Sequence, residues 1–383
     1  MSRRVLHTKL CDLLEIEYPI VQAGMAREAG PTLTAAVSNA GGLGILGGAG
    51  VSADQLAQWI RETKRLTSKP FGVNLLLPAA GFNIRPLEEL KDDYDKATAF
   101  VQSLMKELNL TESKQGMDLW ANMSEEYMKK EVEVVLGEHV PVLMSGLGMP
   151  DWLPPLAHEN EVKVMSLVGN TRQARYLANL GVDIIVAQGT EAGGHASKIG
   201  ALALIPQAVD AVSPTPVIAA GGVADGRGLA ACLTLGAQGV MCGTAFVATH
   251  EFGVDYEESS GFPSSREFHD YWKQNVIKAS DSDPKITRIF SGKTARGFPN
   301  ELTRRWEEEG IPIIVMPYQS ALVSKLDTAA VLAGKYEYAC TLAGNIAGLI
   351  KEVKNASQVI EEMVDGAINV LSNVVPSHVK LSK

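Results

Sequence analysis

Short apolar runs separated by helical segments recur eight times within the first 250 residues. The runs are rich in Val, Ile and Leu, and most end in glycine or a polar residue, as buried parallel strands do. Between one marker residue in each run, the intervals are 23, 28, 69, 24, 20, 33 and 23 residues, and all but the third suit one strand with one helix. This alternation predicts an α/β fold, a (β/α)8 TIM barrel. The markers are Ile20, Leu43, Phe71, Val140, Val164, Ile184, Val217 and Val240.

The 69-residue interval contains a segment that breaks the pattern. Residues 78–125 are polar and charged, with helical stretches but no strand signal. We expect a helical insertion after the third strand, over the barrel mouth, which is either a lid or a solvated excursion of the chain. After Thr244 the alternation stops, and residues 251–383 are expected to form a mainly helical C-terminal extension, a small cap packed on the barrel of residues 1–250.

Composition limits the classes of partner. Of the 383 residues, 46% are hydrophobic and 21% charged, which is enough for a sizeable core. The net charge of −9 argues against a nucleic-acid or anionic-membrane surface, and no run approaches the ~20 apolar residues of a membrane helix. The four cysteines are scattered, which argues against a zinc site or a disulfide framework and favours a reducing compartment. Because the N-terminal residues lack the apolar core of a signal peptide, we expect a cytoplasmic protein.

Polar chemistry gathers where the sixth run ends. Ile184–Gln188 leads into a turn that carries glycines, an amide, a carboxylate and an imidazole. Ligands of α/β folds bind at the carboxyl ends of strands. The plain alternative is a glycine-rich turn with a surface histidine. The functional interpretation makes His195 the catalytic candidate and Gln188, Gly193 and Gly194 candidates for ligand binding.

Two earlier strand ends belong to the same edge of the barrel. The first run ends in four candidates for ligand contacts, Gln22, Ala23, Gly24 and Met25. Asn74 lies inside the third apolar run, where an unpaired amide costs ~1–3 kcal/mol. It therefore needs a partner, either a protein group or a cofactor. The string Gly42–Gly47 matches a dinucleotide fingerprint, but it follows a helix and encloses the second strand, so a Rossmann site is not expected.

The seventh and eighth strands end in small residues that leave backbone N–H groups accessible. In TIM barrels the loops after these two strands often bind phosphate, although two ordinary glycine turns would look the same. A phosphate there, an amide at the third strand and the turn at the sixth outline one elongated ligand, which FMN fits. No metal is expected, because His195 has no second His or Cys at ligand spacing. The candidates at these ends are Gly221, Gly222, Met241, Cys242, Gly243 and Thr244.

Several strings in this order resemble the nitronate monooxygenase family, formerly called 2-nitropropane dioxygenases, and the related flavin-dependent enoyl-acyl-carrier-protein reductases. The most specific string is AQGTEAGGH at residues 187–195; the others are QAGM at 22–25, GGLG at 41–44, PFGVN at 70–74, PVIAAGG at 216–222 and GT at 243–244, with a weaker echo, LAGNIAG, at 342–348. Departures are Gly24 in place of the common Pro, Ala196 and Ser197 in place of Gly, and the long insertion; they bear on the substrate rather than on the flavin. The resemblance implies an FMN enzyme on a TIM barrel, with His195 beside the flavin as a base or substrate-orienting group and FMN contacts at Asn74, Gln188, Gly193, Gly222 and residues 241–244.

The activity that the resemblance implies is oxidation of alkyl nitronates by FMN and O₂ to a carbonyl compound and nitrite. The partners expected are a small-molecule substrate and O₂, with no nucleic acid and no membrane. An NAD(P)H-dependent flavin reductase of enoyl thioesters or quinones is the alternative, since both groups share the glycine motifs. A flavin-binding protein without turnover is a third possibility. The oligomeric state is left open, with a homodimer as one expectation.

Overall fold

The eight predicted strands form one parallel sheet that closes into a barrel. The computed structural model describes residues 6–26, 28–78, 85–112, 124–255 and 265–380. The strand order is β1-β9-β8-β6-β5-β4-β3-β2, and a parallel bridge between Val21 and Leu43 joins the two end strands. Each strand lies within or overlaps its predicted run, so the TIM barrel is confirmed. The strands are β1 (Ile20–Gln22), β2 (Gly44–Gly47), β3 (Phe71–Leu76), β4 (Val142–Gly146), β5 (Lys163–Val168), β6 (Ile184–Gln188), β8 (Val217–Ala220) and β9 (Gly239–Cys242).

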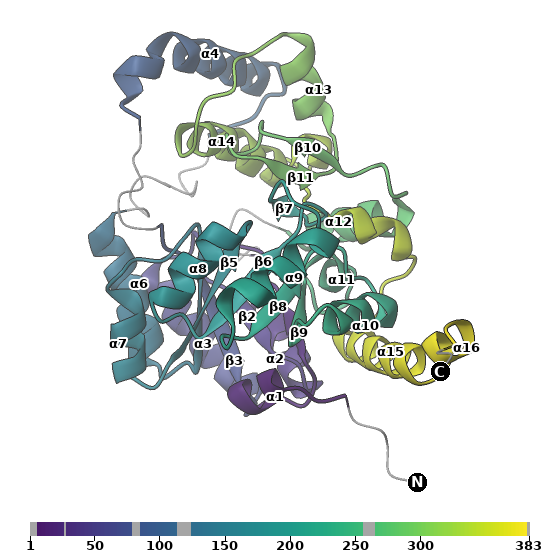
Figure 1. Ribbon diagram of the computed structural model, residues 1–383. Helices are drawn as coiled ribbons and strands as arrows, with labels where there is room; N and C mark the ends of the chain where they lie inside the picture. Colours follow the sequence, from purple (N-terminus) through teal and green to yellow (C-terminus); the bar gives the residue numbers. More distant parts are fainter. Residues whose placement is uncertain (1–5, 27, 79–84, 113–123, 256–264, 381–383) are drawn as a thin grey trace.

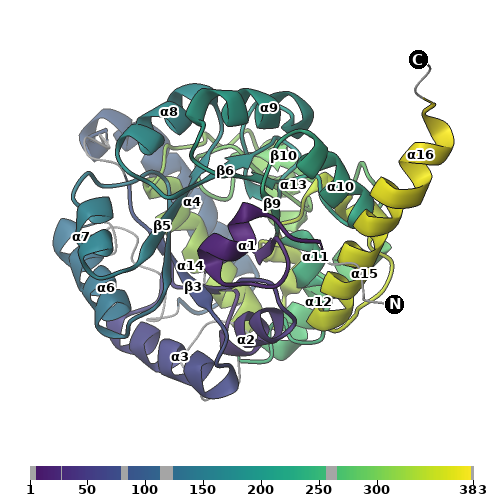
Figure 2. The ribbon, with the colours of Figure 1, turned by 60° about the horizontal axis from the view of Figure 1, so that its bottom comes forward.

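Helices follow the strands on the outside of the barrel. Two of them begin at serine caps, where Ser52 accepts a hydrogen bond from the backbone N–H of Gln55 (3.2 Å) and Ser124 accepts one from Tyr127 (3.1 Å). Figure 2 views the barrel from below and shows the helix α1 (Lys9–Leu14) across its lower opening. Leu10 and Leu14 of this helix belong to the apolar cluster that fills the barrel interior. The outer helices are α2 (Pro31–Asn39), α3 (Ala53–Leu66), α6 (Glu125–Gly137), α7 (Leu153–Glu159), α8 (Thr171–Asn179), α9 (Ala201–Val212), α10 (Gly226–Thr234) and the short α11 (Thr244–Val247).

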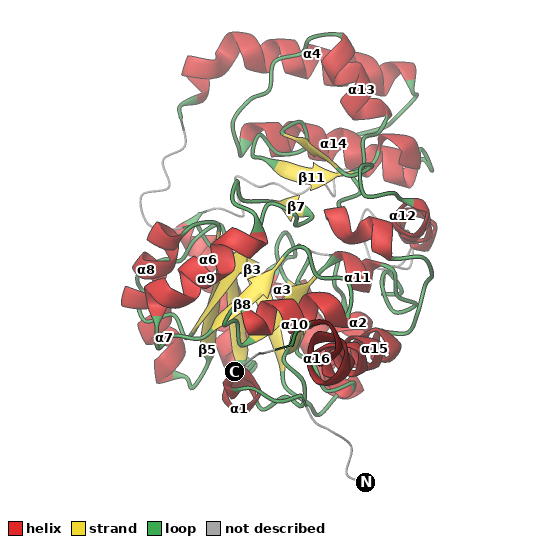
Figure 3. Ribbon diagram, turned by 45° about the vertical axis from the view of Figure 1, so that its right-hand side comes forward, coloured by secondary structure: helices red, strands yellow, loops and turns green. Residues whose placement is uncertain are grey.

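A second layer of structure, the upper unit, lies above the carboxyl ends of the strands (Figures 1 and 3). It combines α4 (Lys91–Glu107) from the insertion with β10 (Lys285–Thr287), β11 (Ala295–Gly297), α13 (Glu301–Glu308) and α14 (Tyr318–Leu332) from the extension. These helices share one apolar cluster, in which the rings of Phe100 and Trp306 meet edge to face at 5.1 Å. The ion pair of Arg305 with Glu107 joins the same two segments at 2.8 Å. The insertion is therefore held by residues almost 200 positions further along the chain.

A three-stranded sheet connects the upper unit to the barrel. Its order is β10-β11-β7, and β7 (Gly194–His195) is the end of the turn that follows β6. Both pairings are antiparallel, with Ala295 opposite His195. This sheet was not expected from the sequence, because its strands are two or three residues long. It places the catalytic candidate on a strand of the upper layer.

After the upper unit the chain returns to the side of the barrel. The 3-10 helix η4 (Asn345–Leu349) lies against α12 (Arg266–Lys278), and α15 (Ala356–Asn369) packs along α10 and α2. The segments η5 (Val370–Val374) and α16 (Val375–His378) continue from α15 away from the body of the protein (Figure 2). The domain boundary at residue 250 stays a prediction. In the described part of the chain, no helix has the length and apolar character needed to cross a membrane.

Candidate active site

The turn after β1 is packed against the ends of β2, β3 and β9. The amide of Gln22 is fully buried in the barrel wall, where it accepts from Ile45 N–H (3.1 Å) and donates to the Ile45 carbonyl (3.2 Å). Its side chain thus ties β1 to β2. A Cβ on Gly24 would lie 2.6 Å from the Asn74 Cβ, so only glycine fits there.

Met25 of the turn after β1 and Gly243 of the turn after β9, two further predicted residues, lie against each other. A Cβ on Gly243 would lie 3.7 Å from both the Met25 sulfur and the Ala23 Cβ, so the ends of β1 and β9 are in close contact. Met25 and the next residue, Ala26, both have positive φ, 49° and 55°. Left-handed backbone at two successive residues with side chains is strained, and such strain gathers at ligand-binding sites.

Asn74 carries an acceptor that has no partner among the described residues. Its Oδ1 is buried and makes no hydrogen bond to any described residue. The oxygen lies 3.9 Å from the position of a Cβ on Gly146, the last residue of β4. A buried oxygen left in this way costs ~1–3 kcal/mol, and a ligand that donates a hydrogen bond would remove that cost.

The ends of β8 and β9 present glycine backbone, as the sequence predicted. Gly221 and Gly222 have φ of 84° and 80°, and a Cβ on Gly221 would lie 2.9 Å from Ala192 N. Met241 and Cys242 are buried in the barrel wall, where burial raises the pKa of the Cys242 thiol well above its usual value. That thiol therefore stays protonated at neutral pH.

Gly344 and Asn345, from the C-terminal extension, pack against the ends of β6 and β9. Gly344 donates its N–H to the Thr244 hydroxyl (2.9 Å), and Asn345 N–H donates to the Glu191 carbonyl (3.0 Å). A Cβ on Gly193 would lie 2.8 Å from Gly344 N, so the backbones of the two glycines pack closely and leave no room for a side chain on Gly193. The signal that could have identified Gly344 and Asn345 was the LAGNIAG echo at residues 342–348.

The polar side chains of the β6 turn have different roles. Gln188 donates from its amide to the His195 carbonyl, which fixes the two ends of the turn. The Glu191 carboxylate accepts the N–H of Ala201 with both oxygens at 3.0 Å, and so caps α9. Glu191 therefore has a structural role, and His195 remains the catalytic candidate of this turn.

His195 is oriented by the segment between β10 and β11. Its Nε2 lies 2.8 Å from the Ser291 hydroxyl, and its Nδ1 makes no hydrogen bond with any residue that the structure describes. The ring keeps exposed surface, yet the protein mass around it desolvates the imidazolium; this, with the Lys293 ammonium nearby, lowers the pKa of His195 to about 4. Burial also lowers the pKa of Lys293. The imidazole is therefore neutral at pH 7. Neither Ser291 nor Lys293 was among the predicted site residues.

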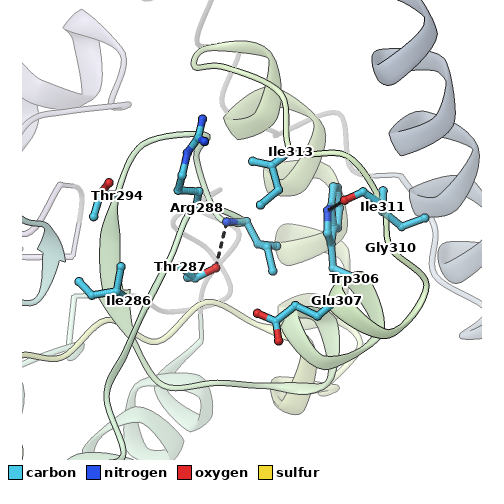
Figure 4. A pocket seen from close by; sticks show the side chains of 10 residues that line it. Ile286, Thr287, Arg288, Thr294, Trp306, Glu307, Gly310, Ile311 and Ile313 are labelled. Atoms are coloured by element: carbon cyan, nitrogen blue, oxygen red, sulfur yellow. Dashed lines mark hydrogen bonds between the residues drawn. The ribbon is translucent and has the colours of Figure 1, made fainter.

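An open hollow in the upper unit lies apart from these residues. Figure 4 shows an open cavity of about 520 Å³ between β10, α13 and the chain that follows α13. Apolar side chains such as Ile286 and Ile313 form much of its lining, together with Arg288 and Glu307, and no predicted site residue lines it. The candidate site is accordingly the set of strand ends beneath the upper unit.

Comparison with known proteins agrees with the fold. The family model described as nitronate monooxygenase matches residues 7–366. The chain belongs to the nitronate monooxygenase family. As a member of this family it is an enzyme, an oxidoreductase of the nitronate monooxygenase type, and the resemblance drawn from the sequence strings is confirmed.

Individual members of this family and solved structures align over nearly the whole chain. A protein of Staphylococcus haemolyticus named "Probable nitronate monooxygenase" is 34% identical, over 96% of this chain and 99% of its own. The structure of nitroalkane oxidase from Streptomyces ansochromogenes is 28% identical, with a TM-score of 0.78, over 95% of this chain and 99% of that one. FabK from Thermotoga maritima is 31% identical, with a TM-score of 0.75, over 98% of this chain and 100% of that one.

Proposed function

We propose that this enzyme binds FMN across the strand ends and uses it, with O₂, to oxidise alkyl nitronates to a carbonyl compound and nitrite. The observation that carries the proposal is the buried Asn74 Oδ1, which has no hydrogen-bond partner among the described residues and lies where the motifs require a cofactor. The isoalloxazine ring of a flavin carries an N–H that can satisfy such an acceptor. The family match over residues 7–366 supports the same conclusion.

The residues around Asn74 fit the rest of the cofactor. Gly221, Gly222 and Gly243 offer backbone with no side chain in the way, which suits a phosphate, and Thr244 continues this edge. Ala23–Met25, Gln188, Gly193, Gly194, Met241 and Cys242 surround or support the space between this edge and Asn74 and complete the proposed FMN site. When bound, FMN would accept electrons from the substrate and pass them to O₂.

The protonation of His195 favours a nitronate over a neutral nitroalkane. With a pKa of about 4, lowered by desolvation and then by Lys293, the imidazole is a weak base and a poor match for removing a carbon-bound proton at pH 7. A nitronate has already lost that proton. His195 then needs only to orient the anion, and the charge of the anion favours protonation of the ring.

Ser291 is placed to fix the tautomer of His195. The Ser291 hydroxyl lies within 3.4 Å of the Lys293 carbonyl, to which it can donate, and it can then accept the proton of His195 Nε2. This arrangement leaves Nδ1 unprotonated, with its lone pair directed away from Ser291. The catalytic role proposed for His195 is therefore to hold or receive a proton at Nδ1.

The test is a spectrum followed by oxygen uptake. Purified protein should show the visible absorption of bound flavin and should consume O₂ with propionate-3-nitronate at a rate far above that of free FMN at equal concentration. His195→Gln should keep the flavin and lose most of the uptake. A colourless protein that takes up no FMN, or uptake no faster than free FMN, would refute the proposal.

The alternative is NAD(P)H-dependent reduction of enoyl thioesters or quinones. It is favoured by the similarity to FabK, which extends over 98% of this chain, and by the resemblance of the motifs to the flavin-dependent enoyl reductases. Oxidation of NADH with a crotonyl thioester or benzoquinone, combined with no O₂ uptake on nitronate, would select this function. For location, the four free cysteines support a cytoplasmic protein.

A further inference from the structure

A buried histidine–carboxylate pair lies next to the proposed FMN site, outside the motifs. His269, on α12, is fully buried, and its Nε2 lies 2.8 Å from Glu28 Oε2. Its Nδ1 lies 2.8 Å from the Ser265 carbonyl. Because a carbonyl oxygen only accepts, Nδ1 carries a proton, and the contact between Nε2 and Glu28 holds a second one. The contact is therefore a charge-assisted hydrogen bond, or its neutral counterpart with the proton on Glu28.

The ring of His269 lies in a niche that fits it closely. A Cβ on Gly253 would lie 2.2 Å from His269 Cγ, and Gly253 has φ of 79°. Phe252 meets the imidazole edge to face at 5.0 Å, and Phe268 does so at 5.6 Å. The ring has little freedom to turn, so the direction of its bond to Glu28 is fixed.

Glu28 in turn closes the turn that follows β1. Its N–H donates to the carbonyl of Met25 at 3.0 Å, and Met25 and the next residue, Ala26, are both left-handed. On one side this turn presses on Gly47, where a Cβ would lie 1.8 Å from the Ala26 carbonyl oxygen and 2.4 Å from that of Gly24. On the other side Met25 reaches Gly243. The turn is thus held between β2 and β9, with Glu28 as its anchor to the extension.

We propose that Glu28 and His269 form a positioning pair, through which α12 holds the Ala23–Ala26 turn in the shape that binds FMN. Left-handed backbone at two successive residues with side chains is unfavourable by itself and persists only where surrounding contacts impose it. The pair supplies such a contact from a segment more than 240 residues away in the chain. The inference rests on the proposed function, in that the ligand of the turn is FMN.

The experiment measures FMN affinity rather than turnover. Apoprotein of the full chain is titrated with FMN and followed by quenching of flavin fluorescence, for wild type, Glu28→Gln, His269→Gln and the double variant. Each single variant should raise the Kd about ten-fold or more, as expected for loss of a buried charge-assisted bond. The double variant should raise the Kd by less than the product of the two single-variant factors, because the first change has already removed the charge-assisted bond. The visible band of the bound flavin should shift in the same variants.

The chain offers a matched control in a second histidine–carboxylate pair. His158 Nε2 lies 2.9 Å from Asp183 Oδ2, between the end of α7 and the start of β6 at the opposite end of the barrel. His158→Gln should leave the Kd and the flavin spectrum unchanged.

The outcomes separate the two proposals. Wild-type protein that binds no FMN overturns the proposed function. Wild type that binds FMN while folded Glu28 and His269 variants bind it equally well overturns the positioning pair, as does an equal loss in His158→Gln. Glu28→Gln keeps the length of the side chain but removes its charge, and with it the charge-assisted bond, and is expected to fold. If His269→Gln does not fold, Glu28→Gln and Glu28→Asp decide the matter alone.

Discussion

Replacing Asn74 with leucine should make the flavin-free protein more stable and the flavin complex weaker. Leucine has nearly the shape of asparagine but no polar atom, so it removes the buried Oδ1 that lacks a partner. Leaving such an oxygen unsatisfied costs ~1–3 kcal/mol, and this cost disappears in the variant. The complex loses the hydrogen bond that the oxygen would accept from the flavin. The same ~1–3 kcal/mol then corresponds to an FMN Kd about 5- to 150-fold higher.

The two effects are measured on the same preparations. Thermal unfolding of apoprotein, followed by circular dichroism, gives the change in stability, and fluorescence titration with FMN gives the change in Kd. Thr328→Val is the matched control, because Thr328 Oγ1 is also buried and has no partner in the described part of the chain, but it lies on α14 in the upper unit. It should stabilise the apoprotein and leave the Kd unchanged. The reasoning would be refuted by an Asn74→Leu apoprotein that melts lower than wild type and binds FMN with the same Kd.

Three further changes test other features. Desolvation lowers the pKa of His195 to about 4 from the ordinary 6.5, so on acidification the unfolded chain takes up this proton before the folded one, and stability is lost as the pH falls from about 6.5 to about 4. His195→Gln should flatten that part of the profile of Tm against pH. An unchanged slope would contradict this prediction. Burial raises the pKa of Glu131 to about 8 from 4.5, so stability is lost as the pH rises through that window. Glu131→Gln should therefore stabilise the protein by ~2–4 kcal/mol at pH 8 and hardly at all at pH 5. Urea unfolding at both pH values measures the difference. Gly47→Ala places a Cβ 1.8 Å from the Ala26 carbonyl oxygen and should weaken FMN binding at least ~10-fold. Gly137→Ala, with no atom within 4 Å of its new Cβ, should leave the Kd for FMN as it was. Equal Kd values for both variants would contradict the packing of the turn.

The barrel could be predicted because its signals are local. Each strand is an apolar run with its own boundaries, and helix starts such as Ser52 and Ser124 carry their capping side chain in place. The upper unit could not be assembled in this way. Its apolar cluster joins Phe100 to Trp306, and no property of either segment alone names the other. The strands β7, β10 and β11 are too short for an alternating pattern to show.

The candidate site shows the same division. Its glycines could be predicted because a turn that needs backbone space selects glycine whatever the distant partner is. Ser291 and Lys293 were missed because they reach His195 through the pairing of β11 with β7, across almost 100 residues. Outside the site, the start of α2 shows the same limit: its N-cap, Gly30, has no side chain, and the carboxylate that binds Thr32 N–H comes from Asp255, beyond β9.

The packing of α15 on α10 and α2 has a consequence for how the enzyme is made on the ribosome. Gly226 of α10 is so close to α15 that a Cβ there would lie 2.2 Å from Ala367 N, and Ile360, Met363 and Val364 are buried in the same cluster. The end of α10 at Thr234 and the start of α15 at Ala356 are 122 residues apart (356 minus 234). At ~5–20 residues per second, translation of that interval takes ~6–24 s. The last of the eight strands is complete early in this interval, at Cys242, and an apolar strip on α2 and α10 then remains uncovered until α15 emerges.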